Sequence, residues 1–311
     1  MKNNKSIYLA IFAIVVIAIV GYFIYQNSSK DDDIIKVGYL VPTLENPFFV
    51  DMTNAAKAKS NEKLQVLVQA SPDELKQNQI IENFITQGVD AICVVPINSE
   101  TIIPAIIKAN KAGIPVVNVD NKINMESAQK QDAKIAFYIG SDNFEGGQSA
   151  GQFIIDQLNE KGKVAILEGV AGNDAAIKRK GGFMKIIKNT EEIEVVASQA
   201  ADWNRQKAND IFQAILAANP DIDAVFACND EMALGAIAAI KNKGVALDSI
   251  VVVGFDAVDE AIKAVASGEL NATIAQQPKL MGETAIELVQ SLLAGETLDK
   301  SYSTPLKVVK K

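Results

Sequence analysis

From residue 34 onward, short apolar runs alternate with amphipathic stretches of helical length. The runs are continuous and rich in Val and Ile. Such runs, when helices separate them, are typical of parallel strands that are buried on both faces. The sequence therefore predicts an α/β fold with parallel sheets. The ten expected strands span residues 35–41, 65–69, 91–95, 116–119, 135–139, 163–168, 194–199, 224–227, 250–254 and 272–275.

Several expected strands end in Gly, Pro, Asn or Asp just before a helix begins. This is the edge of a parallel sheet at which α/β proteins bind ligands. Asn46-Pro47 illustrates the pattern, because Asn is favoured at a helix cap and Pro at the first helical position. We expect a helix from Pro47 to about Lys63, with Asn46 able to cap it and to face a ligand. Ten strands are many for one sheet, so we also expect a break near residues 141–143 that gives two halves of similar plan.

The chain contains no histidine, which excludes Ser/His/Asp and Cys/His catalytic sites and histidine-ligated zinc. Its formal net charge of −8 argues against nucleic acid or an anionic membrane surface as a partner. It has neither a P-loop nor a Gly-x-Gly-x-x-Gly motif. We therefore expect no enzyme activity, no cofactor and no metal site. Cys93 and Cys228 lie in apolar runs and are expected to be buried free thiols.

Residues 7–25 form an uncharged apolar run that Lys2 and Lys5 precede. The run is long enough to span a bilayer as a helix, and the lysines favour a cytoplasmic N-terminus with the body exported. It has no clear Ala-x-Ala-like cleavage site, and no cysteine follows it that would make a lipoprotein anchor. A retained membrane anchor and a cleaved signal peptide both stay open. Residues 26–33 are polar and are expected to be a solvated tether.

Five segments of the body carry side chains suited to gripping a small polyol. They read TLENPFFV at 43–50, GNDAA at 172–176, NDEMALGA at 229–236, VVGFD at 252–256 and ATIAQ at 272–276. In order and spacing they resemble the ribose-binding proteins of bacterial ABC importers, a branch of the type 1 periplasmic binding proteins. The resemblance covers essentially everything after Asp33.

This resemblance implies two Rossmann-like lobes that are joined by three crossings of the chain and that hold a sugar between them. The crossings are expected near Ser141, Gln276 and Pro305. Residues 34–141 plus 277–304 would form the first lobe. Residues 142–276 plus a final strand within 305–311 would form the second lobe.

The resemblance also assigns the ligand contacts. Aromatic rings would pack against the C–H faces of a sugar, and hydroxyl groups would bind between carboxylates and amide or guanidinium donors. Some residues have a structural alternative: Asn229 and Asp256 can cap helices, and Arg179 lies in a basic triplet typical of a solvated face. The expected contacts are Asn46, Phe48, Phe49, Asp120, Arg179, Trp203, Asn229, Phe255, Asp256 and Gln276.

Three positions depart from the ribose-binding pattern. The family's ribose binders carry Ser at the position of Pro42, Asn at Val95 and Arg at Asn121. Asn cannot replace the forked, cationic donor of Arg. Asn98 either replaces the amide lost at Val95 or does not reach the ligand. The resemblance therefore supports a sugar as the ligand class but does not single out ribose.

We expect an extracytoplasmic protein, monomeric, that captures a monosaccharide and delivers it to ABC permease subunits, with membrane contact through the N-terminal segment only. The alternative is a sensory protein that presents its closed form to a chemoreceptor or kinase. Sugar-responsive repressors share the two-lobe fold, but they need an N-terminal helix-turn-helix. An apolar run occupies that place here.

Overall fold

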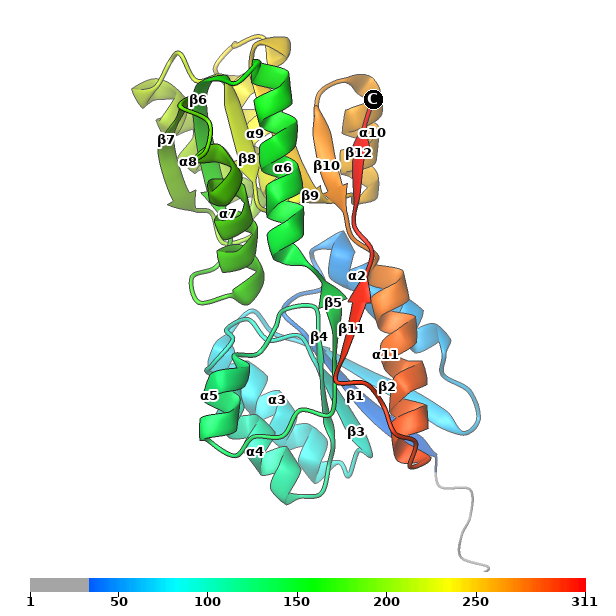
Figure 1. Cartoon of the computed structure of the whole chain (residues 1–311). Helices are drawn as coiled ribbons and strands as arrows, with labels where there is room; N and C mark the ends of the chain where they lie inside the picture. Colours follow the sequence, from blue (N-terminus) through cyan, green and yellow to red (C-terminus); the bar gives the residue numbers. More distant parts are fainter. Residues whose placement is uncertain (1–33) are drawn as a thin grey trace, which may run out of the picture.

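Two six-stranded sheets organise the chain in the computed structural model, which describes residues 34–311 (Figure 1). The expected anchor or signal segment at 7–25 lies outside the described residues. Within residues 34–311, no helix combines the length and apolar character that crossing a membrane requires. We call the part built on the first sheet lobe 1 and the part built on the second sheet lobe 2.

Lobe 1 has the strand order β11-β5-β4-β3-β1-β2, with every neighbouring pair parallel. Its helices cover both faces of the sheet (Figure 1). The strands are β1 (Ile35–Val41), β2 (Leu64–Ala70), β3 (Ala91–Val94), β4 (Val116–Val119), β5 (Tyr138–Ser141) and β11 (Ser301–Thr304). The helices are α2 (Pro47–Ala58), α3 (Glu74–Thr86), α4 (Ile103–Lys111), α5 (Met125–Lys130) and α11 (Pro278–Leu293).

Lobe 2 has the order β12-β10-β9-β8-β6-β7, and only the β10–β12 pair is antiparallel within the described chain. The strands are β6 (Lys161–Glu168), β7 (Glu192–Ala200), β8 (Ala224–Ala227), β9 (Val251–Asp256), β10 (Ala272–Ala275) and β12 (Lys307–Lys310). The helices are α6 (Asn143–Leu158), α7 (Asp174–Ile187), α8 (Arg205–Ala218), α9 (Asp230–Asn242) and α10 (Asp259–Ser267), with a 3-10 turn η1 (Leu247–Ser249).

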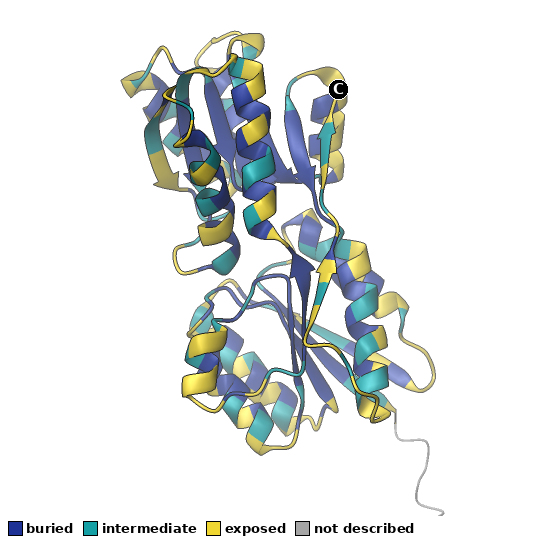
Figure 2. Cartoon of the chain, viewed as in Figure 1, coloured by how far each residue is buried: buried dark blue, intermediate teal, exposed yellow. Residues whose placement is uncertain are grey.

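The chain passes between the lobes three times: from β5 to α6, from β10 to α11, and from β11 to β12 (Figure 1). The predicted α/β fold with two lobes and three crossings is therefore confirmed. The central strands are buried along most of their length, the edge strands β2, β7, β11 and β12 are partly exposed, and the helices present alternating buried and exposed residues (Figure 2). This is the burial that continuous apolar strands and amphipathic helices produce.

Two of the expected boundaries were wrong. Helix α2 ends at Ala58 and not near Lys63, because Asn61 Oδ1 accepts a hydrogen bond from the backbone of Lys63 and folds the chain into a turn. Strand β5 lies at Tyr138–Ser141 and not at 135–139. It pairs with β4 on one side and on the other with β11, a short polar strand that the sequence pattern did not predict.

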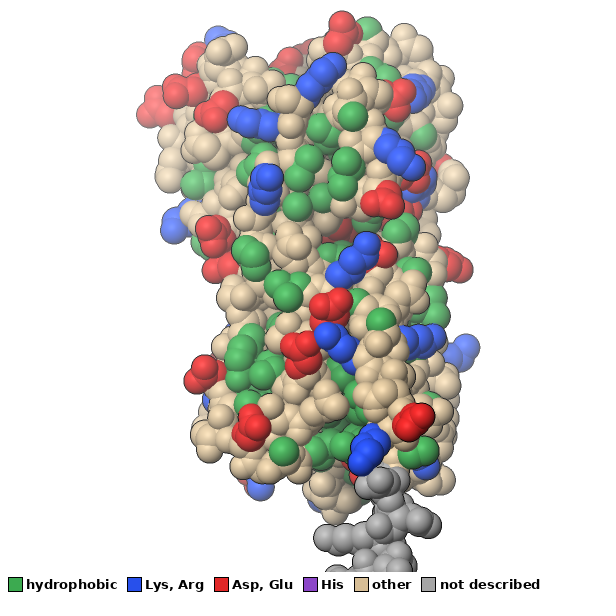
Figure 3. All heavy atoms as spheres, turned by 90° about the vertical axis from the view of Figure 1, so that its right-hand side faces the viewer, with side chains coloured by type: hydrophobic (Ala, Val, Ile, Leu, Met, Phe, Trp, Pro, Cys, Tyr) green, Lys and Arg blue, Asp and Glu red, His purple; other side chains and the backbone are tan. Residues whose placement is uncertain are grey.

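Cys93 and Cys228 are buried and free, as expected. On the face that carries α2 and α11, basic and acidic side chains are interspersed rather than gathered by sign (Figure 3). That face therefore offers no concentrated basic patch of the kind that nucleic acid selects.

Helices α6 and α7 pack so closely that two glycines are required between them. A Cβ atom on Gly182 would lie 2.0 Å from Phe144 O, and one on Gly147 would lie 2.0 Å from Arg179 O. Contacts of this length are impossible, so any side chain at these positions forces the helices apart. The close packing sets the position of Arg179 on α7.

We predict that Gly182→Ala destabilises the fold by about 1–3 kcal/mol, the usual cost of overpacking. The neighbouring Gly181→Ala is the matched control, because its Cβ would meet no atom closer than 3.6 Å. In a helix that change stabilises by up to about 1 kcal/mol. Chemical unfolding of both variants measures the difference, and equal effects would contradict the packing argument.

Candidate functional site

A cleft of about 1000 Å³ lies where the carboxyl ends of the strands of both lobes face each other. It is the position at which open α/β sheets bind ligands. Nine of the ten residues expected to contact a ligand line it: Asn46, Phe48, Phe49, Asp120, Arg179, Trp203, Asn229, Asp256 and Gln276. The tenth, Phe255, is fully buried behind Arg179 and is not among the lining residues.

Aromatic rings enter the cleft from both lobes. Phe48 and Phe49 begin α2 and pack edge to face, with ring centroids 5.2 Å apart. Trp203 comes from lobe 2 with a backbone φ of +64°, which is uncommon for a bulky residue. Its ring fits over Gly169, where a Cβ atom would lie 2.0 Å from Trp203 Cζ2. The two sets of rings give the cleft an apolar surface on each side.

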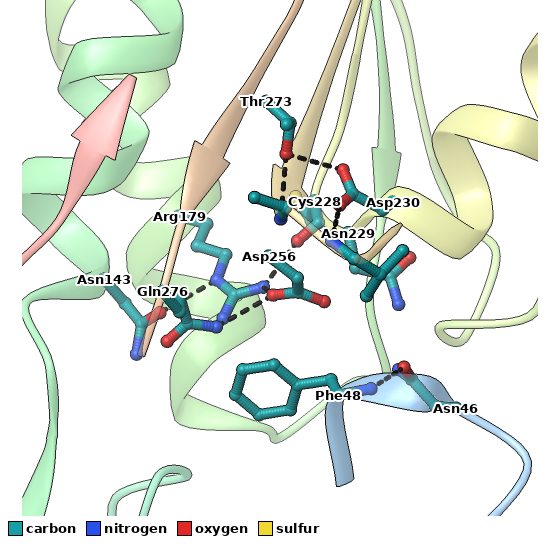
Figure 4. Close-up of polar contacts among 12 residues, drawn as sticks. Asn46, Phe48, Asn143, Arg179, Cys228, Asn229, Asp230, Asp256, Thr273 and Gln276 are labelled. Carbon is teal, nitrogen blue, oxygen red and sulfur yellow. Dashed lines mark hydrogen bonds and ion pairs between the residues drawn. The ribbon is translucent and has the colours of Figure 1, made fainter. Parts of the chain in front are cut away.

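Arg179 is the buried cation of the cleft, with a side chain only 4% exposed, whereas the other lining cations, Arg205 and Lys207, are more accessible to solvent. Its Nε donates to Asn143 Oδ1 at 2.8 Å, and Nη1 donates to Cys228 O at 2.7 Å and to Asp256 Oδ1 at 3.4 Å (Figure 4). The guanidinium carbon lies 3.8 Å from the centroid of the Phe255 ring. This stacking gives Phe255 a role in holding Arg179.

Asp256 ends β9 with a φ of +116°, a strained conformation for a residue other than glycine. Gln276 Nε2 donates to Asp256 Oδ1 at 2.8 Å. Burial raises the pKa of Asp256 to about 7, against the lowering effects of Arg179 and Gln276. The strained turn is fixed from behind by Asp230, whose carboxylate accepts from Thr273 Oγ1 and from the backbone of Val258 (Figure 4).

Asp120 is the buried carboxylate of lobe 1, at the end of β4 with a φ of +59°. Its Oδ1 has no hydrogen-bond partner within residues 34–311. Burial raises its pKa to about 6, although the cation of Arg179 in the other lobe acts in the opposite direction. A buried oxygen without a donor is costly, so this atom is suited to accept a hydrogen bond from a ligand.

Asn46 and Asn229 combine the two roles that the sequence left open. Asn46 Oδ1 accepts from Phe48 N and Asn229 Oδ1 accepts from Met232 N, so each caps a helix. Because the Oδ1 atoms accept these capping bonds, the Nδ2 group of each residue is the one that can donate a hydrogen bond to a ligand. Capping thereby orients both amides.

The three departures from the ribose-binding pattern lie in lobe 1. Pro42 and Asn121 line the cleft, whereas Val95 is buried and does not. Asn121 Nδ2 donates to Pro96 O at 3.1 Å. Asn98 is not a lining residue, because its Oδ1 accepts from the backbone of the turn that follows.

Sequence reasoning missed several residues that support the site. Asn143 holds Arg179, and Asp230 and Thr273 hold the turn after β9. Asp230 lies within the NDEMALGA segment but was not singled out, and its neighbour Glu231 points elsewhere and pairs with Arg205. Asn173, which lines the cleft, lies within the GNDAA segment but was not singled out. Only a polar residue at a helix start signalled Asn143.

One short segment of the sequence matches a motif of serine hydrolases. Residues 147–151 read Gly-Gln-Ser-Ala-Gly and match Gly-x-Ser-x-Gly. The string lies inside α6 and not at a strand-to-helix turn, and the chain has no histidine to act as a base. It therefore cannot form a nucleophile elbow with its triad.

The lobes touch directly at one rim of the cleft. Ser99 N donates to Gly172 O at 3.2 Å, and Asp174 N donates to Ser99 Oγ at 3.1 Å. Asn173 Nδ2 donates to Ile97 O at 2.9 Å. These three bonds connect the loop after β3 to the start of α7 and hold the lobes together beside the cleft.

Two α/β lobes around a cleft with aromatic rings, carboxylates and a buried guanidinium define a two-lobed solute-binding protein. The chain belongs to the periplasmic binding protein family, whose "Periplasmic binding protein domain" matches residues 37–297. It is 39% identical to a ribose import binding protein of Bacillus subtilis, over 88% of this chain and 86% of that protein. It is 35% identical to the D-allose-binding periplasmic protein of Escherichia coli, over 87% and 88%.

Solved structures agree with this family. A periplasmic solute-binding protein of an ABC transporter from Actinobacillus succinogenes, with bound D-allose, superimposes with a TM-score of 0.83. It is 35% identical, and the match covers 89% of this chain and 97% of that one. These relatives are binding proteins and not enzymes.

We predict that Asp120→Asn raises the melting temperature more at pH 8 than at pH 5. The folded-state pKa of Asp120, about 6, lies above the ordinary value of 3.8, so the wild type loses stability as the pH rises from about 3.8 to about 6, and this loss is complete at pH 8 but only partial at pH 5. The neutral amide avoids that cost. Asp132→Asn is the control, because Asp132 has the same φ of +59° but is exposed. Equal shifts at both pH values would contradict the prediction.

Proposed function

We propose that this protein is an extracytoplasmic solute-binding protein that captures a monosaccharide between its lobes and delivers it to an ABC importer. The observation that carries the proposal is the chemistry of the cleft, in which aromatic rings from both lobes flank carboxylates, amides and the buried guanidinium of Arg179. Rings pack against the C–H faces of a sugar, and the polar groups pair with its hydroxyls. Two relatives are named as a ribose import binding protein and a D-allose-binding protein, and these names support the same ligand class.

The ligand is a ribose-like pentose or a related sugar. Most of the polar groups around the cleft come from lobe 2, among them Arg179, Asn229 and Asp256. In lobe 1, the amide of Asn121 donates to Pro96 O, and Pro42 offers no donor. Ribose itself must therefore be tested against other sugars and not assumed.

Delivery to an importer is favoured over the sensory alternative because the relatives are import binding proteins. An exported body follows from the family and from the N-terminal apolar run at 7–25, which acts as a retained anchor or a cleaved signal. We propose a monomer that contacts the membrane through that segment alone and meets the permease subunits through its folded part.

The mechanism is closure of the hinge. Residues 34–141 plus 277–304 move as one lobe, and residues 142–276 plus 305–311 move as the other. A sugar that bonds both Asp120 in lobe 1 and Asp256 in lobe 2 favours the closed state by its greater affinity for that state. The bonds of Ser99 and Asn173 along the rim join the two lobes, so opening the hinge there would break them, and they add to the stability of the closed state.

Calorimetric titration of the purified protein with ribose, allose and a panel of pentoses and hexoses tests the proposal. We expect saturable one-to-one binding of at least one sugar. The absence of heat with every sugar would remove the sugar assignment and leave the fold and family.

Asp256→Ala should weaken binding of that sugar at least tenfold, because a hydrogen bond to a charged group contributes about 1.5–3 kcal/mol. Asp259→Ala is the matched control, since Asp259 lies three residues further along the chain and is exposed. Circular dichroism verifies that both variants are folded. Unchanged affinity in folded Asp256→Ala would remove Asp256 from the binding site.

Sugar affinity should rise between pH 5 and pH 8. The pKa values of Asp120 and Asp256 are raised to about 6 and about 7 by burial. Hydroxyl groups donate best to ionised carboxylates, so binding lowers these pKa values and releases protons. Titration in two buffers of different ionisation enthalpy counts the released protons. Proton uptake on binding would reverse the sign and contradict the expected role of the carboxylates.

A further inference from the structure

We propose that Tyr138 and Asn143 are positioning residues for sugar binding, one at each end of the first crossing between the lobes. Tyr138 holds Asp120 in lobe 1, and Asn143 holds Arg179 in lobe 2. The proposal rests on the proposed function, since it concerns the same cleft. Neither residue lines the cleft itself; both line a separate cavity of about 420 Å³ at the hinge. Each therefore acts through the residue that it bonds.

Tyr138 fixes the backbone of Asp120. Its Oη donates to Asp120 O at 2.9 Å, and the residue is only 9% exposed. The next glycine makes room for this bond, because a Cβ atom on Gly140 would lie 2.1 Å from Tyr138 Oη and 3.1 Å from Asp120 O. Asp120 has a φ of +59°, a conformation that costs energy unless its surroundings hold it. The hydroxyl of Tyr138 supplies part of that hold.

Asn143 fixes the guanidinium of Arg179. Its Oδ1 accepts from Arg179 Nε at 2.8 Å, and the side chain is buried (Figure 4). The cap of α6 is supplied by the preceding residue, since Asp142 Oδ1 accepts from the backbone of Phe144 and Glu145. Asn143 is thus not needed as a cap, and its oxygen is available to orient Arg179. The other two acceptors, Cys228 O and Asp256, bond the far end of the guanidinium.

The crossing connects these two contacts. Tyr138 begins β5, and Asn143 is the first residue of α6, so one short segment reaches a cleft residue in each lobe. Between them, Ser141 Oγ and Thr304 Oγ1 share a hydrogen bond of 3.0 Å that ties the first crossing to the third. A rotation at this segment changes the placement of Asp120 relative to Arg179. The hinge angle and the geometry of the cleft are therefore coupled.

Tyr138→Phe and Asn143→Leu remove the hydrogen-bonding atoms at nearly constant volume. Calorimetric titration with the sugar that the wild-type protein binds should show a loss of affinity of about threefold to tenfold for Tyr138→Phe and about tenfold or more for Asn143→Leu. If Asn143→Leu does not fold, Asn143→Ala takes its place.

Two variants control for a purely structural effect. Tyr302→Phe changes a tyrosine of the same hinge cavity whose Oη accepts from Asp299 N and contacts no cleft residue. Asn209→Leu removes a buried amide of lobe 2 that bonds Gly235 O. We expect both to bind the sugar as the wild type does, whatever their melting temperatures.

A double-mutant cycle separates positioning from general stability. In the Asp120→Asn background, Tyr138→Phe should change affinity by less than twofold, because the group that it positions is already altered. Its effect on the melting temperature should persist. An undiminished loss of affinity in that background, or wild-type affinity of the single variants, would overturn the proposal.

A measurement without sugar keeps the two proposals distinguishable. Asp120→Asn raises the melting temperature more at pH 8 than at pH 5, and the size of this difference depends on where the Asp120 carboxyl group lies. We call this difference the gain. Tyr138→Phe should change that gain, and Tyr302→Phe should not. If no sugar binds but this change is seen, the proposed function fails while the positioning of Asp120 by Tyr138 stands; if the gain is unchanged, the positioning fails.

Discussion

The cleft depends on a single buried cation. An isolated guanidinium removed from water costs several kcal/mol unless other groups pair with it. Arg179 meets this requirement with Asn143, Cys228 O and Asp256, and with the ring of Phe255 beneath it. Its partners come from α6, the end of β8 and the end of β9. Satisfying one charge therefore fixes three segments of lobe 2 at the edge where a ligand binds.

The buried side chains around the cleft include more carboxylates than cations. Asp120, Asp230 and Asp256 are buried, and Arg179 is the cation that lowers the pKa of Asp120 and Asp256. Asp230 is compensated by Thr273 and by backbone donors, so it serves as a support. Burial raises the pKa of all three carboxyl groups, and Asp120 and Asp256 in addition have strained backbones with positive φ. A ligand rich in hydroxyl donors relieves part of this cost, which is how a destabilised site gains affinity.

The two lobes are linked by more than the covalent crossings. At the rim, the loop after β3 bonds the start of α7, and this helix also carries Arg179. At the hinge, the segment from Tyr138 to Asn143 bonds Asp120 on one side and Arg179 on the other. Because α7 packs on α6 through glycines that leave no room for a side chain, the position of α6 constrains that of Arg179. The contacts between the lobes and the contacts that hold Arg179 therefore involve the same two helices.

The sequence by itself determined the α/β class, ten of the strands and nine of the ten expected ligand contacts that line the cleft. These features are local: apolar runs form buried strands, and Asn46, Asn229 and Asp256 lie at or shortly after the carboxyl ends of strands in the two sheets. The tertiary structure decided the rest. The polar segment 301–304 forms strand β11 because it pairs with β5. The ring of Phe255 packs against the guanidinium of Arg179 and does not line the cleft. Asn143 becomes a partner of Arg179, 36 residues away along the chain. Pairings over such separations depend on how helices and sheets pack, and no local pattern encodes them.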